Sequence, residues 1–510
     1  MTKIISGARE ADYEVLRGNA ARAAQGFIAE CGIGAGDTVS LFLRNDFAFY
    51  EASDAAAMLG AYLVPINWHY GAEEAGYIMQ DSGSKVLVVH ADLLPGIASA
   101  IPEGVKVLAV PTPPEIAEAY GITREQGQVP AGAQDWYEWL GGYEPTVPEP
   151  VESPGAMIYT SGTTGRPKGV RRTPASPGQI AELFSIAARA FGIEPGMSTI
   201  IPAPMYHSAP NAYAGLSTVI GAERIVLMPR FEPEELLRLI EVHRTTHIQT
   251  VPTMFVRLLK LPEEVRGKYD LSSLKFVVHA AAPCPPEVKR QMIEWWGPVI
   301  NEYYGATEIG AVVVCNSEEA LAHPGTVGRP VEEAELKILD DDDNELPVGE
   351  VGEIYCRLRG STDFTYHGDD AKRQGVERQG LISVGDIGYL NQEGFLFICD
   401  RRNDMVISGG TNIYPAEIEN CLIEHPAIAD CAVFGIPDEQ FGEALCACIQ
   451  LRDGASLEQT EVSEYLRSHL AGYKVPKVIE FLGELPREDS GKIFKRKLRE
   501  PYWEGQERSI

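Results

Sequence analysis

Short apolar runs alternate with amphipathic stretches along much of the chain, and this alternation constrains the fold more than any other feature of the sequence. Between residues 37 and 90 the runs VSLFL (39–43), AYLVPIN (61–67) and KVLVVH (85–90) are separated by amphipathic segments at 46–59 and 72–82. The short apolar runs predict buried strands, and the longer segments with helical spacing predict helices. Strands that alternate with helices are typical of a parallel sheet covered by helices.

The same rhythm returns after residue 220 and predicts a second α/β layer. Between the two layers, residues 111–155 are rich in Pro, Gly and acidic side chains, which indicates a surface connection. From 325 to 400, short strands with Gly and Asp turns predict a small antiparallel or barrel unit, and an α+β segment follows from about residue 404. The second set of strands and helices is RIVLMP (224–229), PEELLRLIEVHR (233–244), HIQTVP (247–252), TMFVRLLKL (253–261) and KFVVHA (275–280).

Length, charge and cysteine usage narrow the class of protein. With 510 residues the chain is too long for one hydrophobic core, so we expect two or more domains. The formal net charge of -29 disfavours a nucleic acid or an anionic membrane as a general partner. The nine cysteines show no paired spacing, and Cys446 and Cys448 alternate within LCACIQL, as on one face of a strand. The N-terminus lacks the apolar core of a signal peptide and no apolar run is long enough to span a bilayer, so we predict a cytoplasmic protein.

The segment YTSGTTGRPKGV (159–170) predicts a polyphosphate site. Its glycines allow a ligand to approach the backbone, its hydroxyls donate hydrogen bonds, and Lys168 adds a mobile positive charge. The spacing differs from that of a P-loop, because Lys168 follows Gly165 by three residues and is itself followed by Gly169. A flexible surface hairpin would explain the glycines. It would not explain two hydroxyls and a lysine directly after an apolar strand.

Four further motifs have the chemistry of a nucleotide site. YYGATE (303–308) combines an aromatic face, a tight glycine turn, a hydroxyl and a carboxylate that could hold Mg²⁺. Asp386 lies between glycines in GDIGYLNQEG, where a carboxylate can accept both hydroxyls of a ribose. Arg401 precedes a Gly-Gly turn, and Lys492 follows a Ser-Gly turn. Each motif has an ordinary structural explanation by itself, but their joint occurrence favours an ATP site.

On these motifs the sequence resembles the adenylate-forming superfamily, which includes acyl-CoA synthetases, luciferases and the adenylation domains of peptide synthetases. The resemblance extends from about residue 12 to about residue 500 and is closest to the acyl-CoA ligase branch. It implies an α/β fold class: a large N-terminal domain over residues 1–402, built of two α/β subdomains plus a small β-barrel, and a small mobile α+β C-terminal domain over residues 403–510.

The resemblance also implies roles for individual residues. The loop residues would bind the β- and γ-phosphates of ATP, YYGATE would contact adenine through Tyr304 and the α-phosphate through Thr307, and Glu308 would bind Mg²⁺. Asp386 would hold the ribose, Arg401 would lie near the ribose and phosphates, and Lys492 would bridge the substrate carboxylate and the α-phosphate. The expected catalytic residues are Lys492, His207, Thr163 and Glu308, and the expected nucleotide-binding residues besides those named are Ser161, Gly162, Thr163, Thr164, Gly165, Lys168, Ala281, Ala282, Pro283, Gly305 and Ala306.

In this superfamily the acyl group passes to a thiol in a second step. The C-terminal domain rotates about a hinge, which removes Lys492 and brings Gly409 and Gly410 to the pantetheine channel. Glycine suits a narrow channel because a side chain would obstruct the thiol. The hinge position is commonly Asp or Lys in the superfamily, whereas this sequence has Asn403, a residue that tolerates unusual backbone angles.

The segment PMYHSAPNAYAGLS (204–217) corresponds to the superfamily's acyl pocket. The resemblance implies that His207 lies beside the acyl carboxylate. Amino-acid-activating relatives have an Asp in this motif, but PMYHSA contains no acid, which favours an uncharged organic acid. The small residues Ala209, Ala212, Ala214, Gly215, Ser217 and Ala306 favour a bulky or long hydrophobic acyl group.

We therefore predict a ligase that uses ATP, Mg²⁺ and coenzyme A on a small-molecule carboxylic acid. A medium- or long-chain fatty acid is favoured, and aromatic and polycyclic acids stay open. CoA is the favoured acceptor, because the sequence after Lys492 is too short for a carrier domain. An acyl-AMP ligase that loads a separate carrier protein and a catalytically silent nucleotide-binding module are the alternatives. The sequence leaves a homodimer open.

Overall fold

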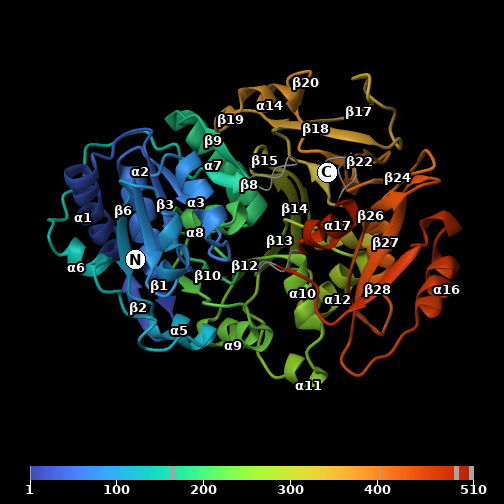
Figure 1. The fold of residues 1–510 in the computed structure, drawn as a ribbon, viewed down its shortest axis with the longest axis horizontal. Coiled ribbons are helices and arrows are strands. Elements are labelled where there is room, and N and C mark those ends of the chain that lie inside the picture. The colour runs from blue at the N-terminus through green and yellow to red at the C-terminus, as the bar shows by residue number, and fades with distance from the viewer. Residues whose placement is uncertain (1, 161–166, 403, 488–492, 505–510) are drawn as a thin grey trace.

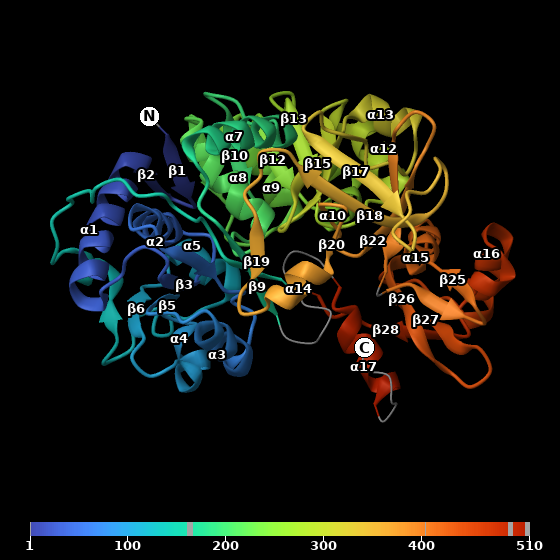
Figure 2. The ribbon, with the colours of Figure 1, turned by 90° about the horizontal axis from the view of Figure 1, so that it is seen from above.

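The computed structural model describes residues 2–160, 167–402, 404–487 and 493–504. Two helix-covered sheets lie side by side, an antiparallel region adjoins them, and the C-terminal segment forms a separate unit beside that region (Figures 1 and 2). This arrangement is the predicted α/β class with a large N-terminal part and a smaller C-terminal part.

The first sheet contains five parallel strands in the order β4-β3-β5-β6-β7. Every residue of β3 and β5 is buried, because helices cover both faces of the sheet and a parallel strand therefore needs apolar side chains on both sides. The strands are β3 (Thr38–Phe42), β4 (Tyr62–Pro65), β5 (Val86–His90), β6 (Lys106–Val110) and β7 (Gln134–Asp135), and the helices are α1 (Tyr13–Cys31), α2 (Phe47–Met58), α3 (Ala72–Asp81), α4 (Leu94–Ile97), α5 (Pro114–Tyr120) and α6 (Trp136–Leu140).

The second sheet has nine strands in the order β16-β15-β14-β13-β12-β10-β11-β1-β2, parallel from β14 through β1 and antiparallel at both edges. Its strands are β1 (Lys3–Ser6), β2 (Arg9–Asp12), β10 (Ser198–Ile201), β11 (Arg224–Leu227), β12 (His247–Thr250), β13 (Phe276–His279), β14 (Ile300–Ala306), β15 (Gly310–Cys315) and β16 (Arg329–Pro330). Its helices are α7 (Pro177–Phe191), α8 (Ser208–Val219), α9 (Pro233–His243), α10 (Pro252–Leu259), α11 (Glu263–Arg266), α12 (Pro286–Trp296) and α13 (Ser317–Ala322).

One hydrophobic core joins the two sheets. It includes Phe27 of α1, Phe49 of α2 and Tyr213 of α8, all at most 2% exposed. The outer face of each sheet has a core of its own, under α9, α10 and α12 on the nine-stranded sheet and under α3 and α4 on the five-stranded sheet. The two predicted α/β layers therefore share one interior.

The predicted barrel is instead an open antiparallel sheet. Strand β18 pairs along one edge with β17. Along its other edge it pairs with β21 at Cys356 and with β22 at Gly352 and Glu353, so the described strands do not follow one another around a closed ring. The strands are β17 (Ala334–Leu339), β18 (Gly352–Leu358), β20 (Glu377–Arg378), β21 (Leu381–Ile382), β22 (Asp386–Leu390) and β23 (Leu396–Arg401), and β8 (Ile158–Thr160), β9 (Lys168–Arg172) and β19 (Phe364–Tyr366) form a separate small sheet near α14 (Asp370–Gly375).

The C-terminal unit has two hydrophobic clusters of its own, and all their described members lie between residues 406 and 502. Among the described residues from 406 onward, two hydrogen bonds reach the preceding part: Lys260 Nζ donates to Ala429 O (2.7 Å), and the Ala416 amide donates to Asp400 Oδ2 (2.9 Å). The elements are β24 (Val406–Ser408), β25 (Thr411–Ile413), α15 (Pro415–Ile423), β26 (Ile428–Asp438), β27 (Gly442–Leu451), α16 (Gln459–His469), β28 (Val478–Leu482) and α17 (Lys495–Trp503).

Two local expectations have different outcomes. Cys446 and Cys448 lie on β27 and are both buried, which confirms the prediction of one strand face. Residues 111–155 are more than a surface connection, since β7 extends the five-stranded sheet and α6 buries Trp136 (0% exposed) and Trp139 (4% exposed). Aromatic side chains this large are buried because their apolar area is costly to expose to water.

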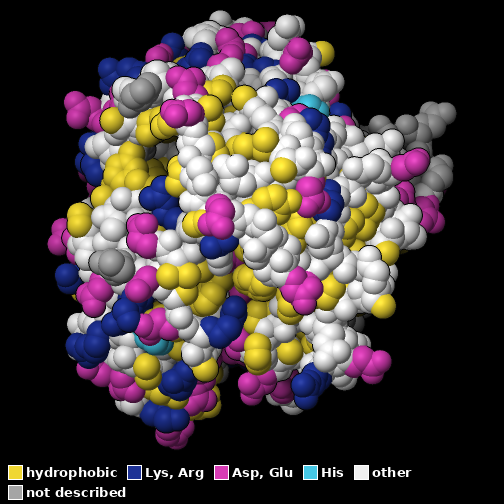
Figure 3. Space-filling model, turned by 90° about the vertical axis from the view of Figure 1, so that its left-hand side faces the viewer, with side chains coloured by type: hydrophobic (Ala, Val, Ile, Leu, Met, Phe, Trp, Pro, Cys, Tyr) yellow, Lys and Arg dark blue, Asp and Glu magenta, His cyan; other side chains and the backbone are white. Residues whose placement is uncertain are grey.

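In the described ranges, no helix has the combination of length and apolar character needed to cross a membrane. The face shown in Figure 3 carries acidic and basic side chains interspersed with apolar ones.

Candidate active site

Tyr304, Asp386 and Arg401 come together where β14 meets the pair β22–β23. Tyr304 Oη donates to Asp386 Oδ2 at 2.7 Å, and Arg401 Nε lies 3.4 Å from Asp386 Oδ1. Asp386 and Arg401 are cross-strand partners, so the antiparallel register places them side by side. Burial raises the pKa of Asp386, while the Arg401 charge and the Tyr304 hydroxyl act in the opposite direction. Burial and the Asp386 charge raise the pKa of Tyr304 well above its ordinary value, which keeps its hydroxyl protonated as a donor.

Gly305 allows the YYGATE segment to turn. The register between β14 and β15 shifts between Tyr304 and Gly305, and a Cβ atom at Gly305 would lie 2.0 Å from the carbonyl oxygen of Gly310. Because the obstacle is backbone, it cannot move aside as a flexible side chain would. The position therefore admits only glycine without opening the hairpin.

We expect Gly305→Ala to lower the free energy of unfolding by about 1–3 kcal/mol, the usual cost of overpacking. The matched control is Gly18→Ala in α1, where an added Cβ has nothing within 4 Å and a gain of about 0.5–1 kcal/mol is expected from helix propensity. Urea denaturation midpoints measure both effects. Equal midpoints for the two variants would contradict the crowding at Gly305.

Arg172, at the end of β9, binds the backbone of Thr307 and Glu308. The Arg172 guanidinium donates to the carbonyl oxygens of Thr307 (2.6 Å) and Glu308 (3.0 Å), and burial lowers the pKa of Arg172. The Glu308 carboxylate accepts a hydrogen bond from Tyr366 Oη at 3.1 Å. Arg172 and Tyr366 belong to neighbouring strands of the small sheet, so this sheet fixes both the backbone and the side chain of Glu308.

The helix α8 starts beside this segment. Ser208, its first residue, lies with Oγ 3.1 Å from Thr307 Oγ1. His207 is the N-cap of α8, and its ring packs against that of Tyr206 with centroids 4.3 Å apart. Among the small residues of α8 that the sequence analysis singled out, Ala214 and Ser217 are buried, whereas Ala212 and Gly215 are exposed.

Other predicted residues are more scattered. Lys168 begins β9, and its Nζ lies 3.6 Å from Asp369 Oδ2. Ala281, in the loop that contains Ala282 and Pro283, has a left-handed φ of 74°, a strained geometry for a residue other than glycine. Gly409 and Gly410, at the turn between β24 and β25, have φ of 58° and 82°, and the Gly409 amide donates to Phe441 O at 2.9 Å. Ser161, Gly162, Thr163, Thr164, Gly165, Asn403 and Lys492 lie outside the described residues.

Comparison with known proteins decides what kind of enzyme has this site. Residues 2–362 match the family model of the AMP-binding enzymes, and residues 417–492 match that of the AMP-binding enzyme C-terminal domain. The chain belongs to the AMP-binding enzyme family. The resemblance to the adenylate-forming acyl-CoA synthetases is thereby confirmed, and the chain is an AMP-forming acid–thiol ligase. Binding of ATP is accordingly supported.

Relatives extend over almost the whole chain. A feruloyl-CoA synthase from Amycolatopsis sp is 30% identical over 506 residues, which cover 98% of this chain and 95% of the relative. A long-chain-fatty-acid–CoA ligase from Mycobacterium tuberculosis (strain ATCC 25618 / H37Rv) is 31% identical over 471 residues, which cover 92% of this chain and 89% of the relative. The crystal structure of ATP-bound MatB from Rhodopseudomonas palustris has a TM-score of 0.83 at 26% identity, covering 98% of this chain and 95% of that one.

The polar side chains at the site of this AMP-binding enzyme are suited to binding a nucleotide together with a divalent cation. The described residues contain no group of three or more His, Cys, Asp or Glu side chains that could hold a metal ion alone. A single carboxylate such as Glu308 is enough for Mg²⁺ when substrate phosphates complete its coordination. Sequence reasoning did not find Arg172, Tyr366 or Ser208. The second arginine of KGVRRT was the available signal for Arg172, but its partners lie 135 and 136 residues away.

Proposed function

We propose that this enzyme activates a hydrophobic carboxylic acid with ATP and transfers the acyl group to coenzyme A. The observation that carries the proposal is the contact between Thr307 and Ser208, 3.1 Å apart. It joins the nucleotide motif to the start of α8, the segment that corresponds to the acyl pocket. A carboxylate bound beside His207 would therefore lie close to the α-phosphate expected at Thr307.

In the first step, a carboxylate oxygen attacks the α-phosphorus and the bond to the bridging oxygen of pyrophosphate breaks. Two anions must meet, so positive groups and fixed donors have to offset their repulsion. Asp386 would hold the ribose, Lys168 and the loop before it the outer phosphates, and Lys492 the reacting oxygens. Mg²⁺ would be held by Glu308 and would neutralise phosphate charge. In the second step, the thiol sulfur attacks the acyl carbon, the bond to AMP breaks, and the thiol proton passes to solvent.

The substrate preference rests on the segment 204–217. PMYHSA lacks an acidic side chain for a substrate ammonium group, and exposed Ala212 and Gly215 leave room along α8. We propose medium- or long-chain fatty acids as the first class to test, followed by aromatic and polycyclic acids. We also propose a division at residues 402 and 403, with a C-terminal domain that turns to bring Gly409 and Gly410 to the thiol, and a cytoplasmic location.

The experiment is pyrophosphate release from ATP and Mg²⁺ over a panel of fatty, aryl and polycyclic acids, with and without CoA, with mass detection of the products. An acid-dependent signal that ends in acyl-CoA supports the proposal and ranks the acids. Acyl-AMP that accumulates in the presence of CoA indicates a carrier protein as acceptor. Cleavage of ATP to ADP overturns the assignment.

Lys492→Ala is expected to lower the rate of acyl-AMP formation by about 100-fold or more, as positioned charges commonly contribute. The transfer of supplied acyl-AMP to CoA should stay within about threefold of wild type, because the lysine is assigned to the first step alone. The two half-reactions are measured separately. Unchanged acyl-AMP formation would remove Lys492 from its assigned role.

A further inference from the structure

A single buried side chain links the five-stranded sheet to the segment that leads into His207. Asn45 follows β3 and is 5% exposed. Its Nδ2 donates to Ala203 O (3.0 Å) and more distantly to Ile201 O (3.4 Å), and its Oδ1 accepts from the Met205 amide (2.8 Å). One side chain thus pairs with three backbone groups of residues 201–205.

The sequence of this segment explains why it needs such a partner. Residues 201–205 read IPAPM, and Pro202 and Pro204 lack the amide hydrogen that a sheet ladder requires. Buried backbone groups must still be paired. Asn offers both an acceptor and donors on a short stem, so it can mimic a neighbouring strand at this point.

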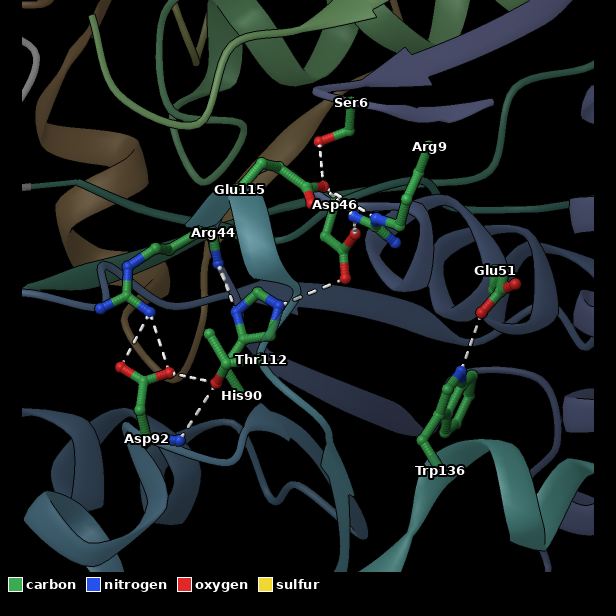
Figure 4. Close-up of polar contacts among 10 residues, drawn as sticks. All are labelled: Ser6, Arg9, Arg44, Asp46, Glu51, His90, Asp92, Thr112, Glu115 and Trp136. Atoms are coloured by element: carbon green, nitrogen blue, oxygen red, sulfur yellow. Dashed lines mark hydrogen bonds and ion pairs between the residues drawn. The ribbon is translucent and has the colours of Figure 1, made fainter. Parts of the chain in front are cut away.

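The turn that carries Asn45 is itself fixed on both sides (Figure 4). The Arg44 amide donates to His90 Nδ1 (3.1 Å), and its guanidinium lies 3.0 Å from Asp92. Asp46 and His90 are fully buried and lie 3.3 Å apart, Oδ2 to Nε2. Arg9, from β2 of the other sheet, donates to Asp46 Oδ1 at 2.6 Å. The backbone on either side of Asn45 therefore has little freedom to move.

We propose that Asn45 is a positioning residue for the acid substrate. It holds residues 201–205 so that His207 and Ser208 stand beside Thr307, and it acts through this segment without touching substrate. The inference rests on the proposed function for the role of His207. It assigns a role in binding the acid to a residue that lies about 160 positions before Met205 in the sequence.

The test compares Asn45→Leu with Thr38→Val. Leucine keeps the branched shape of the Asn45 side chain, although it is larger, and removes all three contacts. Thr38 lies at the other end of β3, where its hydroxyl donates to Ser82 O (3.0 Å, buried), so Thr38→Val removes a buried hydrogen bond from the same strand without touching residues 201–205.

We expect the KM for the acid to rise about 10-fold or more in Asn45→Leu, since small misplacements near a reacting group have large effects. The KM for ATP should stay within about twofold, and Thr38→Val should leave both constants unchanged. Equal shifts in the two KM values, or no shift, would overturn the proposal.

Amide hydrogen exchange separates this inference from the proposed function. In Asn45→Leu the Met205 amide loses its acceptor, so a peptide covering residues 201–207 should exchange about 10-fold faster or more than in wild type and in Thr38→Val. This readout requires no substrate. If wild type releases no pyrophosphate with any acid, the proposed function fails while the exchange result still stands. Unchanged exchange overturns the positioning role whatever the activity.

Asn45→Asp serves as a second variant if Asn45→Leu does not fold. It keeps the acceptor for Met205 but turns a carboxylate oxygen toward the carbonyl of Ala203. Faster exchange and a raised KM for the acid are expected again, and wild-type values in both measurements contradict the proposal.

Discussion

Asp386→Asn should lower kcat/KM for ATP by about 100-fold or more, the scale of a lost charge-assisted contact in a buried site. The amide keeps the shape of the carboxylate and can still accept from Tyr304, but it would accept less strongly from the two ribose hydroxyls that we propose Asp386 binds. Steady-state kinetics with ATP as the varied substrate measures the loss. Tyr304→Phe, which removes the hydroxyl and keeps the ring, is the control, and a drop of about 5-fold is expected from one lost hydrogen bond.

Asp386→Asn is expected to leave the melting temperature of the protein unchanged or to raise it. Burial raises the pKa of Asp386 in the folded protein, so the native state keeps the proton to a higher pH than the unfolded chain does. The stabilisation from that proton is complete below the unfolded pKa and is lost as the pH rises through the folded pKa. An amide at this position does not titrate, so Asp386→Asn would remove this dependence. The Arg401 side chain, 56% exposed, can be solvated without its partner. A large drop in melting temperature at neutral pH would show that the Asp386 charge stabilises the fold.

Arg172→Met is expected to lower kcat by about 30-fold or more and the free energy of unfolding by about 2–3 kcal/mol, because two backbone carbonyls lose a charged donor. Methionine fills much of the space and donates nothing. Since those carbonyls belong to Thr307 and Glu308, the Mg²⁺ concentration for half-maximal rate should also increase. A titration of activity with MgCl₂ measures kcat and the Mg²⁺ concentration for half-maximal rate. A urea denaturation curve measures the free energy of unfolding.

Arg171→Met is the matched control for Arg172. The Arg171 guanidinium lies over the Tyr62 ring, 4.8 Å from its centroid, so its loss should cost only about 0.5–1 kcal/mol, the range of an exposed cation–π contact. Arg171→Met should not change the Mg²⁺ concentration for half-maximal rate. Equal behaviour of the two variants would mean that Arg172 does not support Glu308.

The periodicity of the sequence was enough to find several of the regular elements of both α/β sheets, although β1, β2, β6 and β10 were not predicted. The runs at 39–43, 85–90 and 247–252 are strands β3, β5 and β12 within two residues at each end, because buried parallel strands need continuous apolar runs. Segment 111–155 was misjudged because its Pro and Gly content outweighed the aromatic cluster in DWYEWL. Three aromatic residues within four positions are a signal of burial that local turn composition does not cancel.

The supports of the site could not be predicted in the same way. Asp386 and Arg401 were identified individually by their motifs, whereas their pairing follows from the β22–β23 register. Asn45 and Arg172 have partners more than 130 residues away. Such contacts depend on how the sheets pack against each other, and no local sequence pattern predicts that packing. The region predicted as a small antiparallel or barrel unit is an open antiparallel sheet, and the sequence could not separate these alternatives because the partners of β18 are revealed only by the three-dimensional arrangement.

The separate hydrophobic clusters of residues 406–502 have a thermodynamic consequence. The hydrogen bonds of Lys260 and Asp400 that reach this unit are polar and can be exchanged for hydrogen bonds to water. The turn of this unit that we propose would open neither cluster, and heat-capacity changes come mainly from exposing apolar surface. Two orientations of the unit would therefore have nearly equal heat capacities, and a van't Hoff plot of their ratio should be close to a straight line.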